Sequence, residues 1–225
     1  MSEADVRSDV RDWIGANWDP DRSLLAWRRL LAESGWAVPS WPTRWHGRGL
    51  PGWADRVVSE ELRAAGAVGT PLGSGMSLAA PTVLEHGPDE LRDRILWPTI
   101  TGEVTWCQLF SEPGAGSDLA GLTTTAARDG DDFVVNGQKV WNTSAHHADF
   151  GMLVARTDWD VPKHAGISYF VLPMRQPGVE VRPILQMNRH SSFNEVFLTD
   201  ARIPATNLVG AEGDGWRIAR TTLMH

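Results

Sequence analysis

Apolar residues in the first part of the chain recur every three or four positions, which is the spacing of one face of an α-helix. The residues that carry this spacing are Val6, Val10, Trp13 and Ile14 in a first segment, and Leu24, Trp27, Leu30 and Leu31 in a second. Ser23 stands at the N-cap position of the second helix, and Ser34-Gly35 ends it. The pattern therefore predicts two amphipathic helices near the N-terminus.

Proline and glycine divide the remainder of this helical part. Residues 36–52 are dense in Pro, Gly and Trp and predict an ordered loop. Helical spacing returns over residues 53–65 and over residues 76–85, where Pro81 predicts a kink. Pro88 suits the first position of another helix. We therefore expect every regular element of this part to be a helix.

From residue 104 onward the apolar period changes to two, which is typical of half-buried β-strands. Residues 133–141 predict a hairpin, because Asn136-Gly137 supplies the two positive-φ positions of a type I′ turn. Further strands are predicted at 123–128, 151–156, 167–172, 179–182 and 195–199. Many short strands separated by turn residues indicate an antiparallel β-sandwich or barrel.

An all-α half followed by an all-β half predicts an α+β chain rather than a Rossmann fold. We expect a helical domain over residues 1–103 and a middle β domain over residues 104–209. Residues 210–225 form a glycine-rich connection and then the apolar start of a helix at Trp216. A helix this short is marginal by itself. The sequence thus indicates that the chain stops as a third, helical unit begins.

Composition and charge exclude several classes of protein. The net charge is −7 without a basic run, so we expect no nucleic-acid partner. The single cysteine, Cys107, excludes an intramolecular disulfide framework. No apolar run is long enough to span a bilayer, and the acidic N-terminus does not resemble a signal peptide, so we expect a cytoplasmic protein. Aromatic usage also changes at the division: before Trp106 every aromatic residue is Trp, whereas all six Phe and Tyr169 follow it.

A Gly/Ser-rich loop ends the segment 106–118, after the first strand of the β half. Gly114 and Gly116 let the backbone approach a ligand closely, and successive N–H groups there can bind an anion. A tight turn between two strands explains the same residues without a ligand. Glu112 and Asp118 fit either a general acid/base pair or the capping of a turn, and the intervening proline and glycines favour capping.

Trp141 and Thr143 lie two positions apart, so a regular strand presents both on the same side. A large flat ring beside a hydroxyl suits a planar heteroaromatic ligand. The alternative is that Trp141 is a core residue.

Two further features predict no chemistry. His146 and His147 with Asp149 do not predict a metal site, because adjacent strand residues face opposite sides. Cys107, at the start of an apolar strand, predicts a small core residue rather than a nucleophile.

In their order and spacing, these segments resemble the acyl-CoA dehydrogenase family of flavoenzymes. The resembling segments are Ser111–Asp118 (SEPGAGSD), Thr123–Ala126 (TTTA), Asn136–Thr143 (NGQKVWNT), Ala148-Asp149 and Asn194–Pro204 (NEVFLTDARIP). The resemblance covers essentially the whole chain. It comprises a helical N-terminal domain, a β middle domain and the first turns of a C-terminal helical domain.

The resemblance implies FAD as the cofactor, with the first β-strand and its loop running along the flavin. The implied cofactor-binding residues are Gln108, Leu109, Phe110, Ser111, Gly116, Ser117, Trp141, Asn142 and Thr143. The Phe110 backbone and the Ser111 hydroxyl would address the polar edge of the flavin ring. Trp141 would pack against the isoalloxazine, and Thr143 would bond near its N5. Ser117 would meet the FAD phosphates or ribityl chain and also bind the pantetheine of the acyl-CoA substrate.

The implied reaction is α,β-dehydrogenation of an acyl-CoA thioester, in which a carboxylate removes an α proton and hydride passes to flavin N5. Electrons would then pass to an electron-transferring flavoprotein or a similar acceptor. The full-length protein would be a homodimer, a homotetramer or a heteromer. In the family a C-terminal helical bundle supplies the glutamate base. No glutamate here matches that motif, so no catalytic residue is assigned, and we expect the 225-residue chain to be inactive by itself.

Three residues depart from the family pattern. Ser111 replaces a common Thr and keeps the hydroxyl, whereas Gln108 replaces a common aromatic residue and Asn142 a common apolar one, which predicts a slightly more polar flavin pocket. Two alternatives stay open. The chain can be a non-catalytic subunit that holds FAD or acyl-CoA only with a partner chain. It can also belong to an acyl-CoA oxidase or flavin monooxygenase of the same fold.

Overall fold

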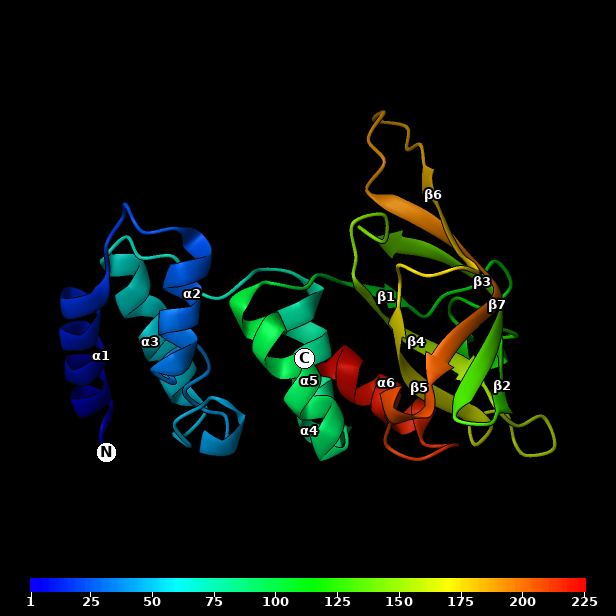
Figure 1. Ribbon diagram of the computed structural model, residues 1–225, viewed down its shortest axis with the longest axis horizontal. Coiled ribbons are helices and arrows are strands. Elements are labelled where there is room, and N and C mark those ends of the chain that lie inside the picture. The colour runs from blue at the N-terminus through cyan, green and yellow to red at the C-terminus, as the bar shows by residue number, and fades with distance from the viewer. The chain divides into compact units, whose positions relative to one another are not determined.

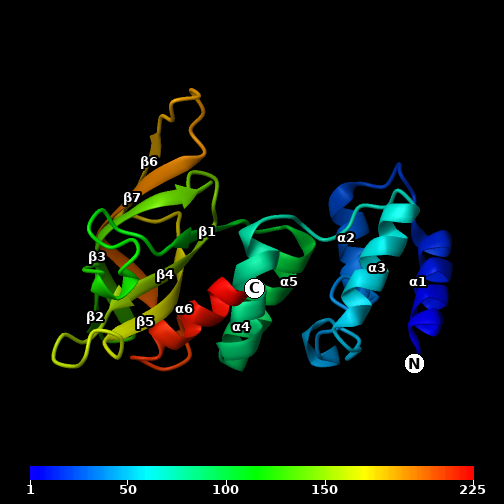
Figure 2. The same cartoon turned by 180° about the vertical axis from the view of Figure 1, so that it is seen from behind.

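The computed structural model describes residues 1–225, and Figures 1 and 2 show its helices and strands from two sides. Contacts divide the chain into two units. The helical unit comprises Met1–Leu72 and Asp93–Glu103, and the sheet unit comprises Gly73–Arg92 and Val104–His225. Helix α5 (Asp89–Thr101) crosses this division. No helix in the structure is both long enough and apolar enough to cross a membrane.

The helices of the helical unit form where the apolar spacing predicts them. They are α1 (Glu3–Asn17), α2 (Leu24–Glu33) and α3 (Trp53–Ala64). The Ser23 hydroxyl accepts a hydrogen bond from the Ala26 N–H at 3.3 Å, so the predicted N-cap of α2 is confirmed. The predicted loop contains a single 3-10 turn, at Thr43–Trp45.

The core of the helical unit comes from the apolar faces of these helices. Its buried residues include Val6, Val10, Ile14, Trp27, Leu31, Trp36, Ala54, Val57, Val58 and Leu62. The Trp27 ring is fully buried, and its Nε1–H donates to the carbonyl of Val68. Tryptophan can fill such a core because its one polar atom finds a partner there.

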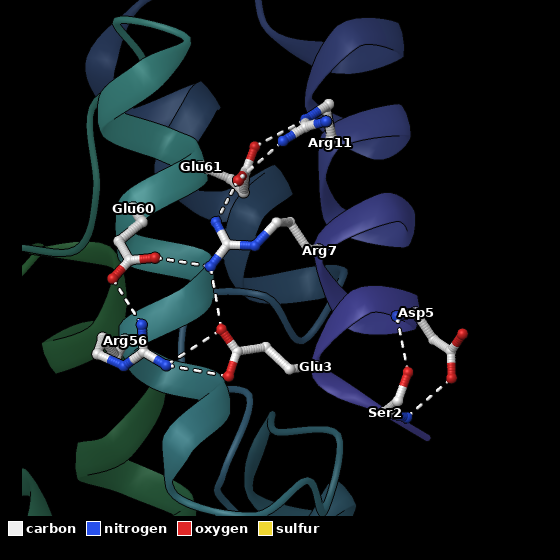
Figure 3. Close-up of polar contacts among 8 residues, drawn as sticks. All are labelled: Ser2, Glu3, Asp5, Arg7, Arg11, Arg56, Glu60 and Glu61. Atoms are coloured by element: carbon white, nitrogen blue, oxygen red, sulfur yellow. Dashed lines mark hydrogen bonds and ion pairs between the residues drawn. The ribbon is translucent and has the colours of Figure 1, made fainter.

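A network of ion pairs joins the outer surfaces of α1 and α3 (Figure 3). Its members are Glu3, Arg7, Arg11, Arg56, Glu60 and Glu61. Arg7 donates to Glu61 at 2.6 Å and to Glu60 at 2.7 Å, while Arg11 donates to Glu61 at 2.9 Å. The network therefore ties the two helices at several points along their length.

The sheet unit begins with helical segments. A π-helical turn over Gly75–Ala79 leads into α4 (Ala80–His86), which ends at Gly87. Pro81 lies in the first turn of α4, directly after the π-helical turn. At the position of the predicted kink the chain changes from π-helix to α-helix.

An eight-stranded mixed sheet forms the body of this unit. The strands are β1 (Trp106–Leu109), β2 (Thr125–Asp129), β3 (Asp132–Thr143), β4 (Phe150–Arg156), β5 (Ile167–Pro173), β6 (Val179–Ile184), β7 (Phe193–Pro204) and β8 (Leu208–Val209). Their order is β6-β7-β3-β2-β4-β5-β8, and β1 pairs with β4. The predicted order of an α half followed by a β half is confirmed. Most pairings are antiparallel as predicted, but β1 and β2 each pair with β4 in parallel.

The hairpin predicted at Asn136-Gly137 is wrong. Strand β3 continues through this dipeptide without turning, with a register shift against β7 between Val135 and Gly137. The hairpin turn lies instead at Gly130 (φ 64°), between β2 and β3. Gly137 is required for space, because a Cβ there would stand 2.4 Å from Thr124 Oγ1. The dipeptide therefore makes a bulge where neighbouring backbone approaches closely.

The chain ends in helix α6 (Gly215–Met224), which follows the glycine-rich turn as predicted. A hydroxyl cluster holds α6 against the rest of the sheet unit. Thr222 Oγ1 lies 2.9 Å from Thr82 Oγ1 of α4 and 3.2 Å from the Tyr169 hydroxyl of β5.

Candidate functional site

Strand β1 has backbone pairing on one edge only, where it meets β4. Its other edge faces β3, and side chains of β3 satisfy the carbonyl groups there. Lys139 Nζ donates to the Phe110 carbonyl at 3.0 Å, and Asn142 Nδ2 donates to the Gln108 carbonyl at 2.7 Å. The only backbone link on this side runs from the Val140 N–H to the Ser111 carbonyl at 2.9 Å. The position of β1 relative to β3 thus depends on polar side chains.

Lys139 also forms a buried ion pair with Glu112. Lys139 Nζ lies 2.9 Å from Glu112 Oε1, and the two side chains are 0% and 4% exposed. Glu112 accepts further hydrogen bonds from the N–H groups of Thr123 and Thr124 at 2.7 and 2.9 Å. Burial raises the pKa of Glu112, but the Lys139 charge and these donors outweigh it and lower the pKa to about 2. Burial lowers the pKa of Lys139 to about 8.

The loop after β1 begins with a tight turn. Glu112 and Ala115 exchange two backbone hydrogen bonds, at 2.9 and 3.1 Å, around Pro113-Gly114. Asp118 pairs with the exposed Lys163 Nζ at 2.7 Å. Both carboxylates are therefore engaged in holding backbone or neighbouring loops. Glu112 thus caps backbone N–H groups, whereas Asp118 forms an ion pair and no cap, and neither arrangement indicates a general acid/base pair.

Trp141 lies at a second bulge of β3, where the register with β7 shifts between Lys139 and Asn142. Its φ of 64° is left-handed, a conformation that is uncommon for a bulky residue. Its side chain is 61% exposed, so the alternative that Trp141 is a core residue is wrong. Thr143 is exposed as well, whereas Asn142 between them is buried. The ring contacts Phe193 of β7 edge-on, at 6.2 Å between centroids.

Two observations test whether a flat polar ring fits beside Trp141. Gln108 Nε2 and Asn142 Oδ1 are buried polar atoms without a hydrogen-bond partner, and such groups are rare unless something satisfies them. At Gly114 and Gly116 an added Cβ would meet no atom within 4 Å, and neither residue has a positive φ. No contact within the chain therefore requires glycine at these positions. Both observations fit a polar ligand that approaches this part of the chain.

The structure brings together some of the predicted residues. Gln108, Phe110 and Asn142 share the β1–β3 edge, and Ser111 follows directly on it. Gly116 and Ser117 are exposed in the loop that follows the tight turn. Leu109 is fully buried and belongs to the hydrophobic core of the sheet.

Lys139 is a residue of this site that the sequence patterns did not predict. One signal points to it, because it is one of only two lysines among 21 basic residues. It also lies inside a strand whose apolar residues face the core, where an unpaired charge would be costly. An ion-pair partner elsewhere in the chain is therefore required, and Glu112 provides it.

The remaining candidates have structural surroundings. Cys107 is fully buried beside Met174, with 3.9 Å between the sulfur atoms, and burial raises its pKa to about 12. The prediction of a small core residue is confirmed. His146 Nδ1 lies 3.0 Å from Asn194 Oδ1, and no three metal-ligating side chains gather anywhere in the structure.

Comparisons with known proteins agree along the whole chain. A family model described as acyl-CoA dehydrogenase, N-terminal domain, matches residues 2–103, and one described as acyl-CoA dehydrogenase, middle domain, matches residues 107–218. Acyl-CoA dehydrogenase FadE34 of Mycobacterium tuberculosis is 49% identical over 86% of this chain and 27% of its own length. Acyl-CoA dehydrogenase IpdE1 of the same organism is 42% identical over 97% of this chain and 61% of its own length.

A solved structure shows the same arrangement of elements. The ChsE4–ChsE5 complex of Mycobacterium tuberculosis matches with a TM-score of 0.73 and 31% identity, over 99% of this chain and 59% of the matched chain. The chain thus spans at most 61% of the length of these proteins.

Proposed function

The chain belongs to the acyl-CoA dehydrogenase family, and from this premise we propose that it forms the N-terminal and middle domains of an FAD-dependent acyl-CoA dehydrogenase. We propose domain limits of 1–103 and 104–209, with residues 210–225 as a connection and the start of a further helical domain. The substrate class is an acyl-CoA thioester, and the reaction removes hydrogen from its α and β carbons.

The observation that carries this proposal is the exposed, left-handed Trp141 next to the buried, unpartnered Gln108 Nε2 and Asn142 Oδ1. The exposed Trp141 ring offers a flat apolar wall that suits a heteroaromatic ring system, and Asn142, the next residue, has a buried amide oxygen without a partner. When bound, FAD would supply an acceptor for the hydride that leaves the substrate. Trp141 would orient the ring and keep water from one face of it.

The other assigned residues would bind the remaining parts of the cofactor and the substrate. The Phe110 backbone and the Ser111 hydroxyl would meet the polar edge of the ring, and Thr143 would lie near its reactive nitrogen. Ser117, with Gly116, would meet the cofactor's phosphates or ribityl chain and the pantetheine of acyl-CoA. Gly116 suits this role because nothing within the chain occupies the space beside it.

We assign no catalytic base to residues 1–225. Glu112 is the carboxylate at this site, and Lys139 with two N–H donors holds its pKa at about 2. A general base needs a pKa nearer the working pH. We therefore propose that the base lies outside residues 1–225, in the length of the relatives that this chain does not cover, and that residues 1–225 alone do not turn over substrate.

An FAD titration tests the proposal directly. Added FAD should bind the purified chain and lose fluorescence, and Trp141→Ala should weaken binding about tenfold, in line with the stacking energy of a heteroaromatic ring on an aromatic side chain. Trp159→Ala is the matched control, because Trp159 is 60% exposed in the same unit but lies outside the site. Equal FAD affinity for the two variants would contradict the assignment of the site.

A second candidate function is that of a subunit which completes its cofactor site with a partner chain. The ChsE4–ChsE5 complex among the structural relatives, whose name gives two different components, favours this candidate. Native mass spectrometry would show FAD bound only when a second, different chain is present. Oxygen consumption by the reduced full-length protein would separate a dehydrogenase, which passes electrons to an electron-transferring flavoprotein, from an oxidase or monooxygenase.

A further inference from the structure

Two buried polar side chains stand on either side of Trp141. Lys139 comes two residues before it and Asn142 one residue after it, and both reach from β3 to carbonyl groups of the β1 segment. The register shift of β3 falls between these two residues. The bulge that exposes Trp141 is thus attached to β1 at both of its ends.

Each attachment is fixed by further contacts. On one side Glu112 holds Lys139 Nζ, and the backbone N–H groups of Thr123 and Thr124, just before β2, hold Glu112. On the other side Asn194 of β7 donates from Nδ2 to the Asn142 carbonyl at 2.8 Å, and His146 Nδ1 lies 3.0 Å from Asn194 Oδ1. The bulge is therefore held from the segment before β2 at one end and from β7 at the other.

We propose that Lys139 and Asn142 are positioning residues that fix the bulge against β1 and so set the spacing between the Trp141 ring and the Phe110–Ser111 backbone. This inference rests on the proposed function, because that spacing is the one a bound flavin ring would need. In this role Lys139 acts through its bond to the Phe110 carbonyl, and Asn142 acts through its Nδ2–H bond to the Gln108 carbonyl rather than through its unpartnered Oδ1. Their action is transmitted through the backbone of β1 and β3.

The chemistry of the pair supports positioning rather than stability as its main role. A buried ion pair commonly stabilises a protein no better than apolar residues of similar volume. What Lys139 supplies and an apolar residue cannot is a directed N–H bond to the Phe110 carbonyl. Asn142 likewise supplies a directed bond to the Gln108 carbonyl, at a position where the strand otherwise alternates apolar residues inward.

The double variant Lys139→Met/Glu112→Gln separates the two roles. It leaves no unpaired buried charge, so the unit should fold, but it removes the bond to the Phe110 carbonyl. Asn142→Leu removes the bond to the Gln108 carbonyl. The matched control is Arg202→Met, which breaks an exposed ion pair with Asp129 and Asp132 elsewhere in the same sheet. Thermal unfolding identifies the variants that are folded.

The first readout needs no cofactor. In a chain labelled with 5-fluorotryptophan, the fluorine resonance of Trp141 is the one lost in Trp141→Phe. We expect this resonance to shift or broaden in the double variant and in Asn142→Leu, and to stay in place in Arg202→Met. A folded double variant with an unmoved Trp141 resonance would overturn the inference.

The second readout is the dissociation constant for FAD from fluorescence quenching. We expect both site variants to bind about tenfold more weakly or worse, as a displaced binding surface does, with the control unchanged. If the unaltered chain binds no FAD, the proposed function fails while the fluorine resonance still decides the positioning role. If the chain binds FAD and the folded site variants bind it equally well, the inference fails and the proposed function stands.

Discussion

Both units of the molecule contain ion pairs, but the network between α1 and α3 and the buried pair of the sheet unit lie in opposite surroundings. In the helical unit, α1 and α3 are joined by six charged side chains of which only Glu61 is buried (Figure 3). In the sheet unit a single pair, Lys139 and Glu112, is enclosed completely. The network between α1 and α3 has several ion pairs surrounded by water, whereas the Lys139–Glu112 pair is shielded from water.

The difference shows what each kind of pair can do. Exposed pairs exchange partners with water and contribute little individually, so their arrangement tolerates change. A buried pair is costly to desolvate and is tolerated only when its hydrogen bonds are satisfied. Lys139 and Glu112 meet that condition with donors and acceptors from β1 and from the segment before β2. The exposed network joins two helices, whereas the buried pair fixes where particular backbone atoms lie.

The largest effect should come from removing one member of the buried pair. Lys139→Met leaves the Glu112 charge buried without its partner, and breaking such a pair costs about 3–5 kcal/mol. Urea-induced unfolding followed by circular dichroism measures this loss. Lys139→Met/Glu112→Gln serves as the control and should recover most of it, whereas a single variant as stable as the unaltered chain would remove the basis of the comparison.

The second-largest effect should be the loss of stability that acid causes at the buried pair. The pKa of Glu112 is lowered from 4.5 to about 2 in the folded state, so its contribution is fully present above pH 4.5 and is lost as the pH falls through 2. The free energy of unfolding should therefore fall less steeply over this window in Lys139→Met/Glu112→Gln than in the unaltered chain. Identical acid limbs for the two proteins would show that Glu112 does not have its depressed pKa.

Within the exposed network, Glu61 should matter most. It is the one buried member, and it accepts hydrogen bonds from both Arg7 and Arg11. Glu61→Gln should lower the Tm measurably, but by less than Lys139→Met does. A loss equal to that of Lys139→Met would show that the two networks do not differ in the way their exposure indicates.

The smallest effect is expected at the rim of the network. Arg56 pairs with Glu3 and Glu60 on the surface, where salt screens such interactions. Arg56→Gln should leave the Tm unchanged at physiological ionic strength. Differential scanning at low and high salt provides the measurement, and a clear loss that persists at high salt would contradict it.

The sequence predicts the helices and strands better than the connections between them. Apolar residues recur every 3.6 or every 2 positions when one face of a helix or strand is buried. Helices α1, α2 and α3 and most strands follow these periods. The hairpin turn predicted at Asn136-Gly137 was wrong because turn residues also suit bulges, and only tertiary contacts decide between a turn and a bulge. The approach of Thr124 to Gly137 and the pairing of Asn136 with Asp200 come from distant parts of the chain.

For the candidate site, the sequence indicates residues but not the contacts that hold them. The resemblance named Trp141 and Asn142, whereas periodicity alone also allowed Trp141 to be in the core. Its exposure follows from the left-handed bulge, which no local pattern marks. Lys139 was not predicted as a site residue because its partner Glu112 lies 27 residues away in the sequence, so no local pattern connects the two.

The long strand β3 also constrains when the site can form during synthesis. Its first half pairs with β2 through a short local turn and also with β7, whereas in the half that contains the Trp141 bulge the strand pairs with β7 and not with β2, and Thr143 meets Phe193. Contacts between distant segments form slowly, and here they must wait until the ribosome has released β7. A nascent chain halted before residue 193 would hold the β2–β3 hairpin with Trp141 still unplaced. The Trp141 bulge is therefore among the later parts of this sheet to form.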